Sequence, residues 1–293
     1  MSKDFNFDSI QIKIPKRSKD SHKGDFGRVL ILGGSEGMGG AAILSSEACL
    51  YSGAGLVSMY THPSNILASL SRNPEIMTLG IRKDFEIPEN TDVILCGPGL
   101  TDNSWSRNIF EKTLAKKSIN TIIFDAGAFN FFSIYEDMLE KLDSNIILTP
   151  HPGEASKLLD KPIDYVQSSR MISARTISAR YKANVILKGK ETVVYVRDNK
   201  HLTGRFVIDH ESYGPQGAYI CLEGGPELST GGTGDVLAGV IAGLRAQKLS
   251  LAEACILSVA VHARAGEIFK NKIGEIGLNA SSLILTIRDL INK

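Results

Sequence analysis

The chain reads RVLILGGSEGMGGAAILSSEACLYSGAGLVSMY at residues 28–60, with apolar runs, glycines and a helical segment in turn. Arg28–Leu32 is a short apolar run that ends at two glycines, which is typical of a strand buried on both faces. Ala41–Tyr51 has the pattern of a helix, and Leu56–Tyr60 forms a second apolar run. A strand, a helix and another strand in this order predict two parallel strands joined by a right-handed crossover.

The same alternation continues along the rest of the chain. Further strand-like runs occupy 93–96, 121–124, 145–148, 184–187 and 192–196. Helical patterns occupy 104–117, 153–159, 165–181, 236–246, 251–270 and 281–291. This order predicts an α/β fold with three α/β/α layers and a mostly parallel central sheet. No repeat or linker interrupts it, so we expect one domain over residues 21–293 after a polar lead-in at residues 1–20.

Composition excludes several classes of protein. The 293 residues are 43% apolar and carry a formal net charge of +1, which predicts a sizeable core and no nucleic-acid partner. No apolar stretch approaches the roughly 20 residues of a membrane span, and the N-terminus lacks a signal-peptide pattern. The cysteines are scattered without a C-x-x-C pair, which predicts reduced, buried thiols in a cytoplasmic protein.

In sheets of this kind, ligands bind beyond the carboxyl ends of the strands. The glycine-rich loops of this chain lie at such positions, next to the predicted strands and helices. The loop 33–40, GGSEGMGG, has no lysine and therefore fails as a P-loop. Residues 37–42 match G-x-G-x-x-A, but the next strand ends at Tyr60-Thr61 without the acid that a dinucleotide site needs. The P-loop pattern and the dinucleotide-binding pattern therefore both fail to identify a ligand site in this chain.

The loop Gly231-Gly232-Thr233-Gly234-Asp235 precedes the apolar segment 236–244. Backbone N–H groups at a helix entrance, together with the helix dipole, form a site for an anion. Asp235 could be a simple N-cap, but the number of glycines exceeds what a cap needs, and Thr233 adds a hydroxyl. A carboxylate base beside an anion site is what phosphoryl transfer to an alcohol requires.

Residues 231–244, GGTGDVLAGVIAGL, resemble the signature of ribokinase-like enzymes, and more narrowly that of the NAD(P)H-hydrate dehydratases. Other segments resemble the same family in the same order, from residue 20 onward. They are HKGDFG at 22–27, VLILGGSEGMGGAAIL at 29–44, SGAGLV at 52–57, GPGL at 97–100, LTPHPGE at 148–154, LKG at 187–189 and GEIGLNAS at 274–281.

The resemblance implies a repair reaction on damaged nicotinamide cofactor. A nucleotide phosphorylates the ring hydroxyl of (S)-NADHX or NADPHX, phosphate leaves, and NADH or NADPH is restored. The resemblance implies ADP, converted to AMP, or ATP as co-substrate, with Mg²⁺ for charge neutralisation. It also implies a cytoplasmic homo-oligomer, with a tetramer as one arrangement.

The family's site residues are carried over by position. Asp235 resembles the catalytic base, which also contacts the hydrate. Ala42, Gly99 and His151 resemble the other hydrate-binding positions. The nucleotide-binding positions are Lys188, Gly189, Lys190, Glu191, Thr192, Gly231, Gly232, Thr233 and Gly234.

Several of these residues also have plain structural interpretations. His151 could be a turn residue between two prolines, Glu154 the start of a helix, and Lys188 an ordinary strand-end lysine. Asp125 lines the site or caps a turn. His262, within a helix of apolar and small residues, is expected to be a packing residue.

The chain departs from the family pattern in two places. The segment Arg197–Ala218 is longer than usual, and its role is left open. Gly225 stands where the family has the asparagine of a Thr-Gly-Asn pattern, which leaves ADP or ATP undecided. The fused epimerase domain of many relatives is not expected. The alternatives are a kinase for a thiazole, pyrimidine or pyridoxal alcohol and a catalytically silent nucleotide-binding regulator.

Overall fold

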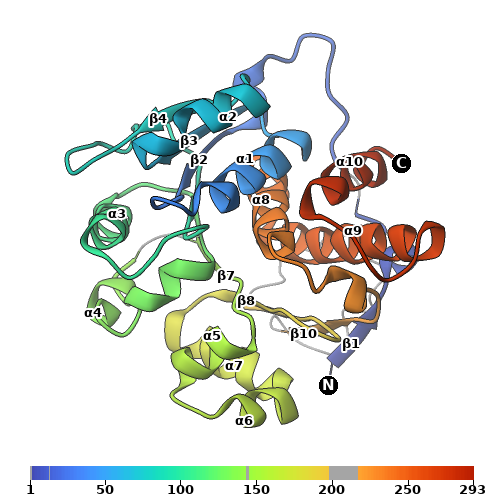
Figure 1. The fold of residues 1–293 in the computed structure, drawn as a ribbon. Helices are drawn as coiled ribbons and strands as arrows, with labels where there is room; N and C mark the ends of the chain where they lie inside the picture. Colours follow the sequence, from blue (N-terminus) through green and yellow to red (C-terminus); the bar gives the residue numbers. More distant parts are fainter. Residues whose placement is uncertain (1, 13, 143–144, 198–216) are drawn as a thin grey trace. The chain divides into compact units, whose positions relative to one another are not determined.

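A computed structural model describes residues 2–12, 14–142, 145–197 and 217–293. The strands belong to one ten-stranded mixed sheet in the order β1-β10-β9-β8-β7-β6-β5-β2-β3-β4, flanked by helices (Figure 1). Antiparallel pairing is confined, among the described pairs, to β8–β9 and β9–β10. The predicted α/β fold with a mostly parallel sheet is therefore confirmed.

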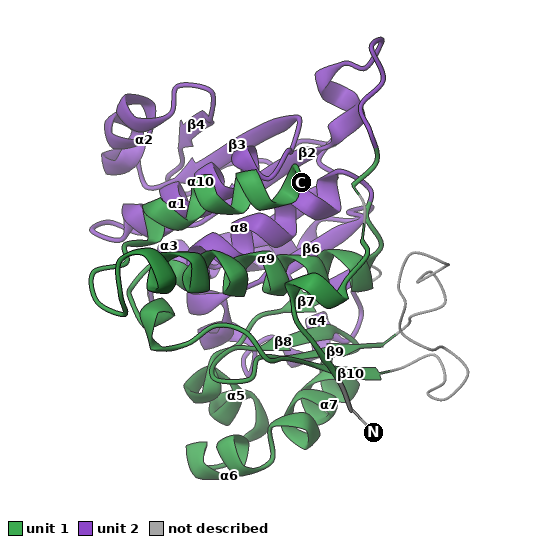
Figure 2. Ribbon diagram, turned by 90° about the vertical axis from the view of Figure 1, so that its right-hand side faces the viewer, with its two compact units in different colours: residues 1–15, 147–233, 249–293 green, residues 16–146, 234–248 purple. Residues whose placement is uncertain are grey.

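The contacts within the chain group into two compact units, shown in Figure 2. Unit 1 comprises residues 1–15, 147–233 and 249–293, and unit 2 comprises residues 16–146 and 234–248. This division does not test the expectation of one domain over residues 21–293, which stays a prediction. Each unit is described in turn.

Unit 2 contains the parallel strands that the opening of the chain predicts. The strands are β2 (Arg28–Leu32), β3 (Leu56–Thr61), β4 (Met77–Gly80), β5 (Val93–Cys96) and β6 (Thr121–Phe124). Its helices are α1 (Gly39–Tyr51), α2 (Ile66–Arg72), α3 (Ser104–Ala115), α4 (Glu136–Leu139) and most of α8 (Thr233–Ala246). Short 3-10 turns lie at η2 (Lys23–Phe26), η3 (Pro63–Asn65) and η4 (Ala126–Phe131). Every residue of β5 and β6 is buried, which explains their continuous apolar runs.

Helix α8 packs closely on α1 because it carries glycines on the contact face. A Cβ atom at Gly239 would lie 2.2 Å from the backbone oxygen of Ser45, and one at Gly243 would lie 2.6 Å from that of Cys49. The Ser45 hydroxyl also donates to the backbone oxygen of Asp235 at 3.0 Å. The apolar helix with its repeated glycines thus fixes the entrance of α8 against α1.

Unit 1 combines parallel and antiparallel strands. They are β1 (Ser2–Phe5), β8 (Asn184–Leu187), β9 (Val193–Val196), β10 (Gly217–Cys221) and the end of β7 (Asn145–Leu148). Its helices are α5 (Pro152–Leu159), α6 (Ile163–Ser168), α7 (Arg170–Tyr181), α9 (Leu251–Lys272) and α10 (Ala280–Ile291), with η1 (Phe7–Ser9) and η5 (Pro226–Leu228). Helices α9 and α10 pack on each other.

Two parts of unit 1 differ from the sequence expectations. The polar lead-in contains β1, which pairs with β10 and buries Phe5; one apolar residue among polar neighbours is too weak a signal for a strand. The helix expected over 165–181 is broken at Ser169, whose φ of −134° and ψ of 45° are not helical. Most of the long segment Arg197–Ala218, residues 198–216, lies outside the described residues.

The cysteines are free and buried, as the sequence predicts. Burial raises the pKa of the Cys96 thiol and of the Cys221 thiol to about 12, and it also raises the pKa of Cys49. Within the described part of the chain, no helix is long and apolar enough to cross a membrane.

Candidate active site

The glycine loop leads into helix α8 as the sequence predicts. The helix begins at Thr233, so Gly234 and Asp235 lie in its first turn, where backbone N–H groups lack partners within the helix. Gly232 has a φ of 93°, in the region that favours glycine. A Cβ at Gly231 would meet no atom within 4 Å, so this backbone is open to an approaching group. Asp235 is half-buried.

The hydroxyl of Thr233 has a different partner from the one expected. Thr233 is buried, and its hydroxyl lies within donating distance of the backbone oxygens of Leu228, at 2.9 Å, and Thr230, at 3.0 Å. These contacts hold the turn from η5 into α8. The Thr233 N–H also donates to the Thr230 oxygen, at 3.4 Å, so the role of Thr233 as a nucleotide contact stays a prediction.

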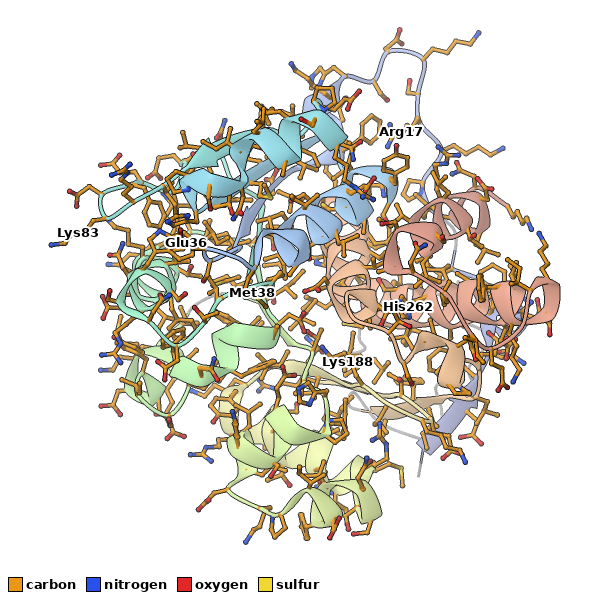
Figure 3. All side chains as sticks on the ribbon, viewed as in Figure 1. Arg17, Glu36, Met38, Lys83, Lys188 and His262 are labelled. Atoms are coloured by element: carbon orange, nitrogen blue, oxygen red, sulfur yellow. The ribbon has the colours of Figure 1, made fainter. Side chains whose placement is uncertain are left out.

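His262 of α9 supports the same turn. Its Nε2 atom lies 2.9 Å from the backbone oxygen of Thr233, and because a carbonyl oxygen only accepts, this nitrogen carries the hydrogen. The pKa of His262 is lowered to about 4, because burial and the charge of Lys188 outweigh the hydrogen bond to Thr233, which raises it (both residues are labelled in Figure 3). His262 is thus a buried, neutral, hydrogen-bonded histidine, which confirms its interpretation as a packing residue.

The lowered pKa of His262 predicts a loss of stability in acid. In the unfolded chain the His262 imidazole takes up a proton near pH 6.5, whereas in the folded protein it does so only near pH 4. The free energy of unfolding therefore decreases as the pH falls from 6.5 towards 4. We expect this residue to account for about 2 kcal/mol of unfolding free energy lost between pH 7.5 and pH 5. Urea titrations at both pH values, on wild type and His262→Gln, measure it. Glutamine does not titrate, so equal losses in both proteins would contradict the prediction.

The stretch Lys188–Thr192 is the turn between the antiparallel strands β8 and β9. The backbone bends at Gly189 (φ 126°) and Glu191 (φ 54°), and Lys190 lies between them, exposed. The Lys188 N–H donates to the Pro150 oxygen at 2.9 Å, and the Thr192 hydroxyl donates to the Gly189 oxygen at 2.9 Å. The turn is therefore tied to the segment that contains His151.

Arg170 fixes the first part of this turn, and sequence reasoning missed it. Its Nη2 atom donates to the backbone oxygens of Leu187 at 2.8 Å and Lys188 at 3.1 Å. Burial lowers the pKa of Arg170, while the charge of Glu191 raises it. A lone arginine at the start of a helix carries no signal in the sequence, because its partners are backbone oxygens of a distant strand.

His151 and Glu154 form a capping box at the start of α5. The Nδ1 atom of His151 accepts from the N–H groups of Gly153 and Glu154, and the Glu154 carboxylate accepts from the His151 N–H at 2.7 Å. The interpretation of Glu154 as the start of a helix is confirmed. The His151 side chain remains exposed beyond its cap, so its role as a hydrate contact stays a prediction.

Unit 2 contains the other predicted hydrate-binding residues. Ala42 lies in α1, is fully buried and has its methyl group adjacent to Gly34, so its role as a hydrate contact stays a prediction. Gly99 has a φ of 69°, and a Cβ there would lie 2.4 Å from the Met38 oxygen. Unit 2 thus brings Ala42, Gly99 and the loop before α1 together.

The family of the chain follows from comparison with known proteins. A family model described as NAD(P)H-hydrate dehydratase matches residues 29–289. The chain belongs to this family.

Named relatives agree with the NAD(P)H-hydrate dehydratase family. The bifunctional NAD(P)H-hydrate repair enzyme Nnr of Vibrio cholerae is 36% identical over 95% of this chain and 52% of its own length. The ADP-dependent (S)-NAD(P)H-hydrate dehydratase of Staphylococcus aureus is 34% identical over 87% of this chain and 86% of its own length. The chain spans about half the length of the first group of curated relatives that it matches.

A solved structure of this family has the same fold. The ADP/ATP-dependent NAD(P)H-hydrate dehydratase of Bacillus subtilis, co-crystallized with ATP/Mg²⁺, is 25% identical, with a TM-score of 0.81 over 99% of this chain and 97% of its own. A ribokinase-like superfamily protein of Enterococcus faecalis is 27% identical, with a TM-score of 0.80 over 99% of this chain and 95% of its own, which confirms the ribokinase-like fold expected from the loop at residues 231–244.

Proposed function

We propose that this protein dehydrates (S)-NADHX and (S)-NADPHX back to NADH and NADPH, with an adenine nucleotide as phosphoryl donor. One observation carries the proposal: a carboxylate, Asp235, lies in the first turn of α8 directly after a glycine turn with open backbone. The names of the relatives support the substrate and favour ADP, which would leave as AMP.

Asp235 is the base in this proposal. Its carboxylate takes the proton of the ring hydroxyl as that oxygen attacks the terminal phosphoryl group of the nucleotide. Hydroxide is a poor leaving group, whereas phosphate is a good one, and the lone pair of the ring nitrogen expels it. Loss of a proton from the neighbouring ring carbon then restores the double bond of the reduced nicotinamide.

Lys188–Thr192 and Gly231–Gly234 are the proposed nucleotide contacts, and Ala42, Gly99 and His151 the proposed hydrate contacts. The entrance of α8 supplies backbone N–H groups and the positive end of the helix dipole, which stabilise charge on the phosphoryl group. Lys188 adds a cation at the end of β8.

Magnesium belongs to the proposal through the nucleotide. Among the described residues, no three histidine, cysteine, aspartate or glutamate side chains gather into a metal-binding group. A Mg²⁺ ion held chiefly by nucleotide phosphates would need only one or two protein carboxylates, and the Bacillus subtilis relative co-crystallized with ATP/Mg²⁺ supports this part of the proposal. The cytoplasmic location and the homo-oligomeric state stay predictions.

A direct assay tests the function. Purified protein is mixed with NADHX or NADPHX, Mg²⁺ and either ADP or ATP, and the absorbance of the regenerated reduced nicotinamide is followed. We expect regeneration that depends on the nucleotide and stops when it is left out. A protein inert with both nucleotides would refute the dehydratase, and phosphorylation of a thiazole, pyrimidine or pyridoxal alcohol in its place would favour the kinase alternative.

A further inference from the structure

The backbone oxygen of Gly34 accepts more hydrogen bonds than most carbonyl groups in proteins. The amide nitrogen Nδ2 of Asn65 donates to it at 2.7 Å, the Thr61 hydroxyl at 3.0 Å and the backbone N–H of His62 at 3.1 Å. All three donors come from the end of β3 and the turn η3 that follows. Since a carbonyl oxygen has two lone pairs, three donors saturate it and fix its direction.

Asn65 contacts both ends of the loop that precedes α1. At one end it holds Gly34, which has a φ of 70° and no room for a side chain, because a Cβ would lie 2.4 Å from the Thr61 hydroxyl. At the other end, a Cβ at Gly39 would lie 2.3 Å from Oδ1 of Asn65. The buried Asn65 side chain therefore sets the distance that the loop spans.

The opposite side of the loop is held by the segment after β5. The N–H of Gly34 donates to the Pro98 oxygen and that of Ser35 to the Gly99 oxygen, each at 2.8 Å. The Ser35 hydroxyl lies 3.0 Å from that of Ser106, and both lie 3.2 Å from the Thr101 nitrogen. Buried hydrogen bonds thus clamp the base of the loop from two sides.

The tip of the same loop is open. A Cβ at Gly37 would meet no atom within 4 Å, and Glu36, Gly37 and Met38 are exposed (Figure 3 labels Glu36 and Met38). A loop with a rigid base and an open glycine tip presents its backbone N–H and C=O groups to a partner.

We propose that Asn65 is a positioning residue for the hydrated nicotinamide substrate, because it holds the loop 34–39, which adjoins the proposed hydrate contacts Ala42 and Gly99. The inference rests on the proposed function and adds to it a residue that never touches the reacting atoms. Asparagine suits the role because Nδ2 has two hydrogens, one for Gly34 and one for the Thr61 hydroxyl at 2.9 Å. Aspartate has the same shape but cannot donate.

Paired variants test the role of Asn65. Asn65→Asp removes the donor without changing size, Thr61→Val removes the hydroxyl, and Thr61→Ser keeps the hydroxyl and serves as the matched control. Steady-state kinetics give KM for the hydrate and for ADP separately. Hydrogen exchange on the free protein reports the loop amides at residues 33–42 without any need for activity.

We expect Asn65→Asp to raise KM for the hydrate about 10-fold, with KM for ADP within about two-fold of wild type. We expect exchange at residues 33–42 to speed up about 10-fold in Asn65→Asp and to a smaller extent in Thr61→Val, with Thr61→Ser like wild type. Loop exchange unchanged in both, or an equal rise of both KM values, overturns the role of Asn65. If the wild-type protein does not act on the hydrate, the proposed function is wrong, and so is the assignment of the hydrate as the ligand of the loop.

Discussion

Replacing Asp235 by asparagine should reduce kcat for NAD(P)H-hydrate dehydration by about 10³-fold or more. Asparagine has nearly the same shape, so the contact of the Asp235 backbone oxygen with Ser45 and the entrance of α8 should persist. What disappears is the group that accepts the proton of the ring hydroxyl in the proposed mechanism. The lost charge at the helix entrance costs only about 0.3–1 kcal/mol of stability, so folding should survive.

The measurement is single-turnover regeneration of NADH, with the affinity for ADP determined by calorimetry. Nucleotide affinity should change little, because the carboxylate is assigned to the hydrate and to proton transfer. Glu253→Gln is a matched control, since Glu253 also lies in the first turn of a long helix, where it belongs to a capping box. It should leave kcat near the wild-type value. Full activity in Asp235→Asn would mean that the base is a different residue.

Buried strands were predictable from sequence to the residue. Val93–Cys96, Thr121–Phe124, Asn145–Leu148 and Asn184–Leu187 have the bounds that their apolar runs predict. They lie inside the sheet, where both faces exclude water and most of their side chains are apolar. The strands that were missed lie at or next to the edges of the sheet: β1 and β4 are its terminal strands, and β10 is the neighbour of β1.

The candidate site divides in a similar way. Its glycines and Asp235 were predictable, because a turn with left-handed backbone followed by an apolar helix leaves a direct trace in the sequence. The supporting contacts were not predictable. Asn65 and Arg170 act through backbone oxygens of distant segments, and the Thr233 hydroxyl, expected beside the anion, donates to Leu228 and Thr230 in its own turn. Such partners depend on tertiary structure rather than on residue type.

Gly239→Ala should lower the free energy of unfolding by about 3 kcal/mol. The new Cβ would lie 2.2 Å from the Ser45 backbone oxygen and 2.9 Å from the Ala48 side chain, so α1 and α8 must separate. A backbone atom cannot rotate away as a side chain can. The helix propensity gained by alanine, about 1 kcal/mol, does not offset this overlap.

Gly40→Ala is the matched control, because Gly40 also lies in a helix of unit 2 and a Cβ there meets no atom within 4 Å. Only the helix propensity then acts, so this variant should be as stable as wild type or more stable by up to about 1 kcal/mol. Urea titration of both variants measures the difference. Equal stabilities would show that α1 and α8 are not in close contact at Gly239, and the glycines of α8 would then need an explanation other than packing.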